Sequence, residues 1–255
     1  MTILDEIATS AKARVEREKR EGLPSRHFRP RSAFLMEETL RKPGFHFLCE
    51  VKRASPSKGL IAPNFPYLAI AREYEEAGAA AISVLTEPDY FQGSDSHLVE
   101  IRGITDLPLL RKDFIVDPFQ IEQAACLGAD AILLICAILS PAELRAYREE
   151  ADRFGLSCLV EAHDEEELQM ALRAGARIVG VNNRDLRTFT VDTGNSIRLR
   201  KLVPEDLLFV SESGIHRAED VELLRQNGIR AALIGEALMR AADKKAALAE
   251  LRGRL

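Results

Sequence analysis

Charged residues of both signs stand where apolar segments of this sequence end. Glu50 and Lys52 end one such segment and lie two residues apart, so that both face the same side of an extended chain. Lys112 ends a second segment and Glu161 ends a third. Ionisable groups are costly to bury unless they face one another or a ligand. If these residues converge, they could perform acid–base chemistry on an anionic substrate; surface-loop charges or a structural ion-pair network are the alternatives.

An internal repeat indicates which elements carry these residues. A glycine followed by an apolar segment recurs at Gly78, Gly128, Gly175 and Gly228, at intervals of 50, 47 and 53 residues. Glycine commonly ends a helix because it adopts the left-handed conformation without strain, and the apolar segment after it is typical of a buried strand. Each interval has room for two strand–helix units.

Three further strands are predicted between these repeats, at residues 108–111, 156–160 and 207–210, and a strand at residues 47–51 opens the series. Helix starts are marked by capping patterns such as Ser140-Pro141-Ala142-Glu143. Eight strands alternating with helices over about 210 residues predict a single (β/α)₈ TIM barrel, an α/β fold, over residues 46–255. Side chains at the carboxyl ends of barrel strands converge on one face, which is where the charged residues fall.

Residues 1–45 precede the barrel pattern and are predicted to form an N-terminal helical extension. Four apolar residues at four-residue spacing mark the first helix: Ile3, Ile7, Ala11 and Val15. Ser32 could cap a second helix that ends at Leu40. A plug over one barrel end is the favoured interpretation, and a lid over the active-site face is the alternative. The charge-rich stretch 14–21 is predicted to be a solvated helix face.

The loops after the seventh and eighth strands are the usual phosphate site of such barrels, because backbone N–H groups point at the anion there. Here these loops contain Gly214 and Gly235, which would let the backbone approach a ligand closely. Neither a Walker loop nor a Rossmann glycine pattern is present, so nucleotide cofactors are disfavoured.

Composition excludes several other classes of function. Lys and Arg number 35 against 40 Asp and Glu, so the basic excess of a nucleic-acid-binding protein is missing. The longest apolar run, residues 131–139, is about half of the ~20 residues that a membrane span needs. The first twenty residues do not resemble a signal peptide, and a cytoplasmic location is expected. Four cysteines and five histidines lack paired spacing, so buried thiols and no protein-held metal are predicted.

Seven sequence blocks resemble the indole-3-glycerol phosphate synthase family. They are residues 50–57, 85–87 with 90–94, 112–115, 159–163, 182–186, 211–215 and 233–239. The resemblance runs from about residue 32 to the C-terminus, and residues 1–45 also resemble the extra N-terminal helices of the family. It implies a carboxy-lyase (carbon–carbon lyase) without a cofactor. The implied reaction converts 1-(2-carboxyphenylamino)-1-deoxy-D-ribulose 5-phosphate into indole-3-glycerol phosphate in tryptophan biosynthesis, with loss of carbon dioxide and water.

The implied chemistry assigns roles to the charged residues. Attack of the anilino ring on a ketone needs a proton donor, for which Lys112 is the candidate. The departing carboxylate needs a cation to hold it, and Lys52, helped by Arg184, is the candidate for that role. Which lysine is the acid in the dehydration step stays open. The resemblance implies that Glu161 is the base or a cation stabiliser and that Glu50 is the partner of Lys52. It further implies that Asn182 and Ser213 orient the reacting groups. Substrate binding is assigned to Glu212, Phe91, Phe114 and Leu133, and phosphate binding to Ser55, Gly214, Gly235 and Glu236.

Two rival interpretations keep the barrel. An isomerase of an aminated ribose phosphate would need a cysteine at a strand end, but Cys49 precedes Glu50 and would face the other way. A phosphate-binding barrel without catalysis would not need the lysines and glutamates, all of which are present. The chain has no tryptophan, although some family members cover the substrate with one near the N-terminus. A monomer that binds a small sugar phosphate, with no nucleic-acid or membrane partner, is expected.

Overall fold

Eight parallel strands close into a barrel in this computed structural model, which describes residues 2–25, 28, 31–185 and 188–253. Their order around the ring is β1-β10-β9-β8-β7-β6-β5-β4. The strands are β1 His46–Val51, β4 Ala81–Leu85, β5 Leu109–Lys112, β6 Ala131–Ile135, β7 Ser157–Ala162, β8 Ile178–Asn182, β9 Leu208–Glu212 and β10 Ala231–Ile234. The predicted (β/α)₈ barrel is therefore confirmed.

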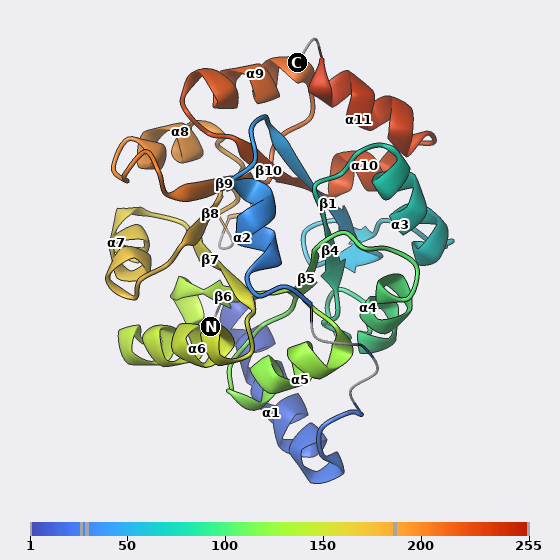
Figure 1. Cartoon of the computed structure of the whole chain (residues 1–255), viewed down its shortest axis with the longest axis vertical. Helices are drawn as coiled ribbons and strands as arrows, with labels where there is room; N and C mark the ends of the chain where they lie inside the picture. The colour runs from blue at the N-terminus through green and yellow to red at the C-terminus, as the bar shows by residue number, and fades with distance from the viewer. Residues whose placement is uncertain (1, 26–27, 29–30, 186–187, 254–255) are drawn as a thin grey trace.

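Helices surround the strands as an outer ring (Figure 1). They are α3 Tyr67–Glu76, α4 Asp95–Arg102, α5 Phe119–Leu127, α6 Pro141–Arg153, α7 Glu165–Arg173, α8 Gly194–Arg200, α9 Ala218–Gln226, α10 Glu236–Arg240 and α11 Lys244–Arg252, with a 3-10 turn, η1, at Cys136–Ile138. The predicted capping box at Ser140 is present, and Gly128 ends α5 with a φ of 88°. A short hairpin, β2 Ala54–Ser55 and β3 Gly59–Leu60, follows β1. Within the described residues, no helix is long and apolar enough to span a membrane.

Alternate residues of each strand divide the apolar core into two layers. Phe47 and Cys49 point outward and pack in the layer between strands and helices. Leu48 points inward, where it joins Leu110 and Leu233 inside the ring. All four cysteines are free and buried, as the sequence predicts. Because Glu50 has the same parity as Leu48, this alternation directs Glu50 toward the barrel interior and Cys49 away from it.

The two N-terminal helices cover opposite ends of the barrel. The short α2, Leu35–Leu40, crosses the middle of the strand ring in Figure 1, and the backbone N–H of Glu37 contacts Ser157 Oγ at the start of β7. The long α1, Ile3–Glu21, lies instead against the carboxyl ends, where it contacts α5 and η1. The short α2 therefore occupies the position expected of a plug, and α1 occupies the position expected of a cover over the other end.

The predicted start of the second helix is wrong. We expected Ser32 to cap it, but α2 begins after Phe34, whose φ of 58° places it in the left-handed region, and no side chain caps the helix. The last turn of α2 ends at Leu40 as expected. Packing decides this boundary, because Met36 and Leu40 are buried against the interior of the barrel.

The predicted exposure of residues 14–21 is wrong at its first position. Arg14 is only 7% exposed, and its Nη2 lies 2.7 Å from Oδ1 of the buried Asp113. Position 14 lies three residues after Ala11 and beside Val15, so it falls on the apolar stripe of α1 and turns toward the barrel. Asp113 directly follows β5 and also accepts hydrogen bonds from Thr86 Oγ1 and the Phe114 backbone. Arg14 thereby anchors α1 to the strand that carries Lys112.

Replacing Arg14 with methionine is expected to lower the free energy of unfolding by about 2 kcal/mol. This is less than the ~3–5 kcal/mol of a fully broken buried pair, because Asp113 keeps Arg111 at 3.3 Å. Urea denaturation of both proteins measures the difference. Arg17→Met on the exposed face of α1 is the matched control, and equal losses in the two variants would contradict the anchoring role.

Candidate active site

A pocket opens at the carboxyl ends of the barrel strands, on the face that α1 covers. All fifteen residues that the sequence marked as catalytic, substrate-binding or phosphate-binding line it: Glu50, Lys52, Ser55, Phe91, Lys112, Phe114, Leu133, Glu161, Asn182, Arg184, Glu212, Ser213, Gly214, Gly235 and Glu236. Strand pairing explains the convergence, since Asn182 is the register partner of Glu212 on neighbouring strands. The last residue of one sequence block, Leu186, lies outside the described residues.

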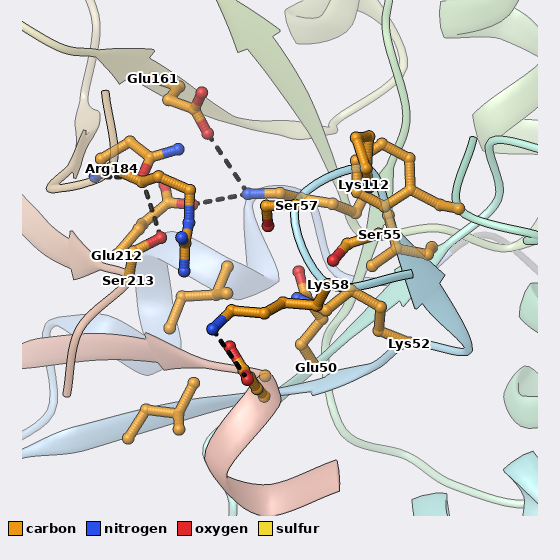
Figure 2. Close-up of a pocket in the computed structure, with 18 of the residues that line it drawn as sticks. Glu50, Lys52, Ser55, Ser57, Lys58, Lys112, Glu161, Arg184, Glu212 and Ser213 are labelled. Atoms are coloured by element: carbon orange, nitrogen blue, oxygen red, sulfur yellow. Dashed lines mark hydrogen bonds and ion pairs between the residues drawn. The ribbon is translucent and has the colours of Figure 1, made fainter. Parts of the chain in front are cut away.

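Lys112 extends across the pocket between two glutamates (Figure 2). Its Nζ lies 2.6 Å from Glu212 Oε2 and 3.5 Å from Glu161 Oε2. Burial alone would lower the pKa of Lys112, but Glu212 and Glu161, with Glu50 farther away, raise it above its ordinary value. The amine is therefore a cation at neutral pH and carries a proton that it can donate.

The two glutamates beside Lys112 differ in their proton affinity. Burial and the nearby negative charge of Glu161 raise the pKa of Glu212. Burial also acts to raise the pKa of Glu161, but Lys112, His163 and a hydrogen bond from Asn182 outweigh it and lower that pKa. Neighbouring carboxyl groups whose pKa values are pushed apart are typical of acid and base pairs in active sites.

Asn182 links the end of β8 to the loops beside it. Its Oδ1 accepts a hydrogen bond from Ser213 Oγ at 2.9 Å and another from the Arg184 backbone N–H at 3.0 Å. With its oxygen occupied, the amide nitrogen is left to donate to Glu161. Ser213 has a φ of 69° and Gly214 a φ of 84°, so the chain turns sharply after β9. This turn brings the backbone of the loop to the pocket surface.

Glu50 and Lys52 form an ion pair at the end of β1. Glu50 is buried, whereas the Lys52 side chain is 16% exposed to the pocket. Gly235, at the end of β10, packs against this pair: a Cβ atom on Gly235 would overlap Glu50 Oε2 and lie 2.8 Å from Lys52 Nζ. A residue with a Cβ atom at this position would displace the ion pair.

Apolar side chains form the wall and the roof of the pocket. The rings of Phe91 and Phe114 lie 6.0 Å apart, and Leu133 lines the same pocket. Ile3, Leu4 and Ile7 of α1 complete the lining from above. The aliphatic face of α1 thus covers this site in a chain that has no tryptophan.

Comparison with known proteins agrees with this geometry. The family model described as indole-3-glycerol phosphate synthase matches residues 3–251. The chain belongs to the indole-3-glycerol phosphate synthase family. It is 55% identical to the indole-3-glycerol phosphate synthase of Ruminiclostridium cellulolyticum over 98% of this chain and 99% of the relative. Identity to that of Endomicrobium trichonymphae is 51%, over 98% and 99% of the two chains.

Solved structures show the same fold at much lower identity. A 3-hexulose-6-phosphate synthase from Salmonella typhimurium matches with a TM-score of 0.66 and 13% identity, covering 81% of this chain and 96% of its own. Likeness at this level shows the barrel alone. The assignment to the indole-3-glycerol phosphate synthase family therefore depends on the sequence relatives and the family model.

Sequence reasoning missed several residues of this indole-3-glycerol phosphate synthase site. Lys58, on the β2–β3 hairpin, reaches across the pocket in Figure 2, with its Nζ 3.5 Å from Glu236 Oε1. The roof residues Leu4 and Ile7 also line the pocket. The stripe on α1 could have revealed the roof residues, but no pattern in the sequence predicts which way the hairpin lysine points.

Proposed function

We propose that Lys112, Lys52 and Glu161 carry out the ring closure that defines the family. The substrate is 1-(2-carboxyphenylamino)-1-deoxy-D-ribulose 5-phosphate, and the product is indole-3-glycerol phosphate. The observation that carries the proposal is the position of the Lys112 ammonium between two buried carboxylates. A proton held at such a point can be delivered to a carbonyl oxygen as the new carbon–carbon bond forms.

Lys112 acts first, as the general acid. The electron-rich ring carbon attacks the ketone, and the carbonyl oxygen takes the proton from Lys112 Nζ, so that oxygen becomes a hydroxyl and the amine becomes neutral. Lys52, with Arg184, holds the ring carboxylate until carbon dioxide leaves and its bonding electrons return to the ring. Glu50 orients Lys52 through their ion pair.

Loss of water completes the indole. Glu161, whose pKa is lowered by Lys112 and His163 against the effect of burial, is ionised and accepts the ring proton while the hydroxyl leaves with a proton from a lysine. Asn182 and Ser213 orient the reacting groups through the hydrogen bonds around Asn182 Oδ1. Glu212 keeps Lys112 protonated between turnovers.

The two ends of the substrate occupy chemically different parts of the pocket. Phe91, Phe114 and Leu133 provide an apolar wall for the benzene ring. The phosphate binds near Ser55, Gly214, Gly235 and the backbone N–H of Glu236. The β9 turn and the glycine at the end of β10 support this placement, because both let the backbone approach an anion.

Both rival interpretations have less support. The isomerase would need a cysteine in the pocket, but Cys49 is fully buried in the outer layer, and the described pocket lining contains no cysteine. A barrel without catalysis would not need a buried lysine between two glutamates. A monomeric state and a cytoplasmic location stay predictions from the sequence.

Purified protein is expected to convert the carboxyphenylamino-deoxyribulose phosphate into an indole. The chain contains four tyrosines and no tryptophan, so indole fluorescence would rise over tyrosine emission alone. Stopped-assay chromatography of the product confirms its identity. Folded protein, checked by circular dichroism, that gives no fluorescence rise would refute the proposed reaction.

A further inference from the structure

His163 lies directly after β7, between a carboxylate of the pocket and a carboxylate of the helix outside it. Its Nδ1 is 3.0 Å from Glu167 Oε2 on α7, and its Nε2 faces Glu161 Oε1 at 3.6 Å. The side chain is 17% exposed, and Nε2 has no hydrogen-bond partner among the described residues. A neutral ring would leave one of these nitrogens without a proton to offer, whereas an imidazolium presents a proton to both carboxylates.

Acidic groups dominate the surroundings of this ring. Those that face it from β7, α7 and β9 are Glu161, Glu167 and Glu212. A second cavity, which His163 lines, adds Asp5 of α1, Asp164 before α7, and Asp185 and Asp192 after β8. Arg184 and Arg198 are the cations of that cavity lining, and the Cys136 thiol on η1 stays protonated because burial raises its pKa. The balance of charge around His163 favours its protonated form.

The charges that line the pocket indicate a role for protonated His163. Lys112 is the lysine that contacts Glu161 and Glu212 there, and the substrate brings a carboxylate and a phosphate in addition. When Lys112 gives its proton to the substrate it becomes neutral, and Glu161 loses the cation on its inner side. A buried carboxylate without a cation tends to take up a proton, which would remove the base.

We propose that His163, as an imidazolium, is a positioning residue that keeps Glu161 ionised and oriented after Lys112 has given up its proton. It does so from outside the pocket, where the substrate does not displace it. The inference rests on the proposed role of Glu161. Burial acts to lower the pKa of His163, but Glu167, Glu161 and Glu212 outweigh it and raise that pKa to about 9. The ring is therefore charged below about pH 9 and neutral above it.

The protonation of His163 can be measured without any assay of activity. Nitrogen-15 NMR of the imidazole rings follows each of the five histidines through a pH titration, and the signal missing from His163→Gln identifies residue 163. The expected titration midpoint is about 9. A midpoint at or below the ordinary value of about 6.5 would overturn the inference. This result stands whether or not the protein forms indole.

Kinetics of His163→Gln test the effect on Glu161. The acid limb of the kcat profile is expected to move to higher pH by about one unit, because an opposite charge at this distance lowers a carboxyl pKa by about 1–3 units and glutamine removes it. On that acid limb kcat is expected to fall roughly tenfold with KM nearly unchanged, whereas at pH 7, well above the lowered pKa of Glu161, it changes little. His46→Gln, at the amino end of β1, is the matched control and should leave the profile in place.

A second variant acts on the other side of the ring. Glu167→Gln removes the carboxylate at Nδ1, so it should lower the pKa of His163 and move the alkaline limb to lower pH while the acid limb stays in place. If His163→Gln lowers the melting temperature but leaves both limbs where they are, His163 only stabilises the first turn of α7 through Glu167, and the inference is wrong. Absence of activity in the wild-type protein would instead refute the proposed function.

Discussion

Lys112→Ala is expected to lower kcat by about 10²- to 10⁴-fold with a smaller change in KM, the loss typical of a missing general acid. Truncation removes the ammonium group that lies between Glu161 and Glu212, and these two carboxylates then repel each other across the pocket. Steady-state indole formation measures both constants. Lys19→Ala, on the exposed part of α1, is the control for loss of a lysine as such.

Two outcomes would contradict this role for Lys112. If KM rises and kcat is unchanged, Lys112 binds substrate, and Lys52 is the better candidate for the acid. If only the melting temperature falls, Lys112 is a structural ion-pair partner of Glu212. Lys52→Ala provides the comparison, because a carboxylate anchor acts already in the ground state and its loss should weaken both binding and turnover.

Gly235→Ala is expected to reduce kcat/KM by about 10²-fold although it adds a single methyl group. The new Cβ would overlap Glu50 Oε2 and lie 2.8 Å from Lys52 Nζ. Both atoms end flexible side chains, so the fold survives while the ion pair moves away from its present position. Weaker phosphate binding near Gly235 would raise KM, and displacement of Glu50 and Lys52 would lower kcat.

Gly103→Ala is the matched control for Gly235→Ala. Gly103 ends α4 with a φ of -68°, which any residue adopts, and its neighbours are backbone carbonyls far from the pocket. Kinetic constants of this variant should equal those of the wild type. Unchanged affinity and turnover in Gly235→Ala would show that the Glu50–Lys52 ion pair does not pack against Gly235 and that the phosphate binds elsewhere.

The barrel could be predicted from the sequence because its signals are local and repeated. Glycines such as Gly128 end helices, capping boxes such as that at Ser140 begin them, and each buried strand is a continuous apolar segment. The location of the site could be predicted from the same pattern, because the carboxyl ends of all barrel strands lie at one face. Resemblance to known enzymes then distinguished Lys112 and Glu161 from other charged residues at strand ends.

The errors concern residues whose environment is set by distant parts of the chain. Arg14 resembles its exposed neighbours in sequence, and only Asp113, 99 positions later, explains its burial. Ser32 has the chemistry of a helix cap, but packing of Met36 inside the barrel sets where α2 begins. His163 follows a strand as many loop residues do, and the two carboxylates that flank it are visible only in three dimensions.

Closure of the strand ring has a consequence for how the chain folds. β1 pairs with β10, so that His46 meets Ala231, a residue 185 positions later. During synthesis the strands from β1 to β9 can form only an open sheet, whose two unpaired edges expose backbone hydrogen-bonding groups. Such distant pairing costs loop entropy before it yields contacts, so folding is slow for a chain of this size. The final strand to leave the ribosome is the one that removes both edges, and chains truncated before residue 231 are expected to aggregate.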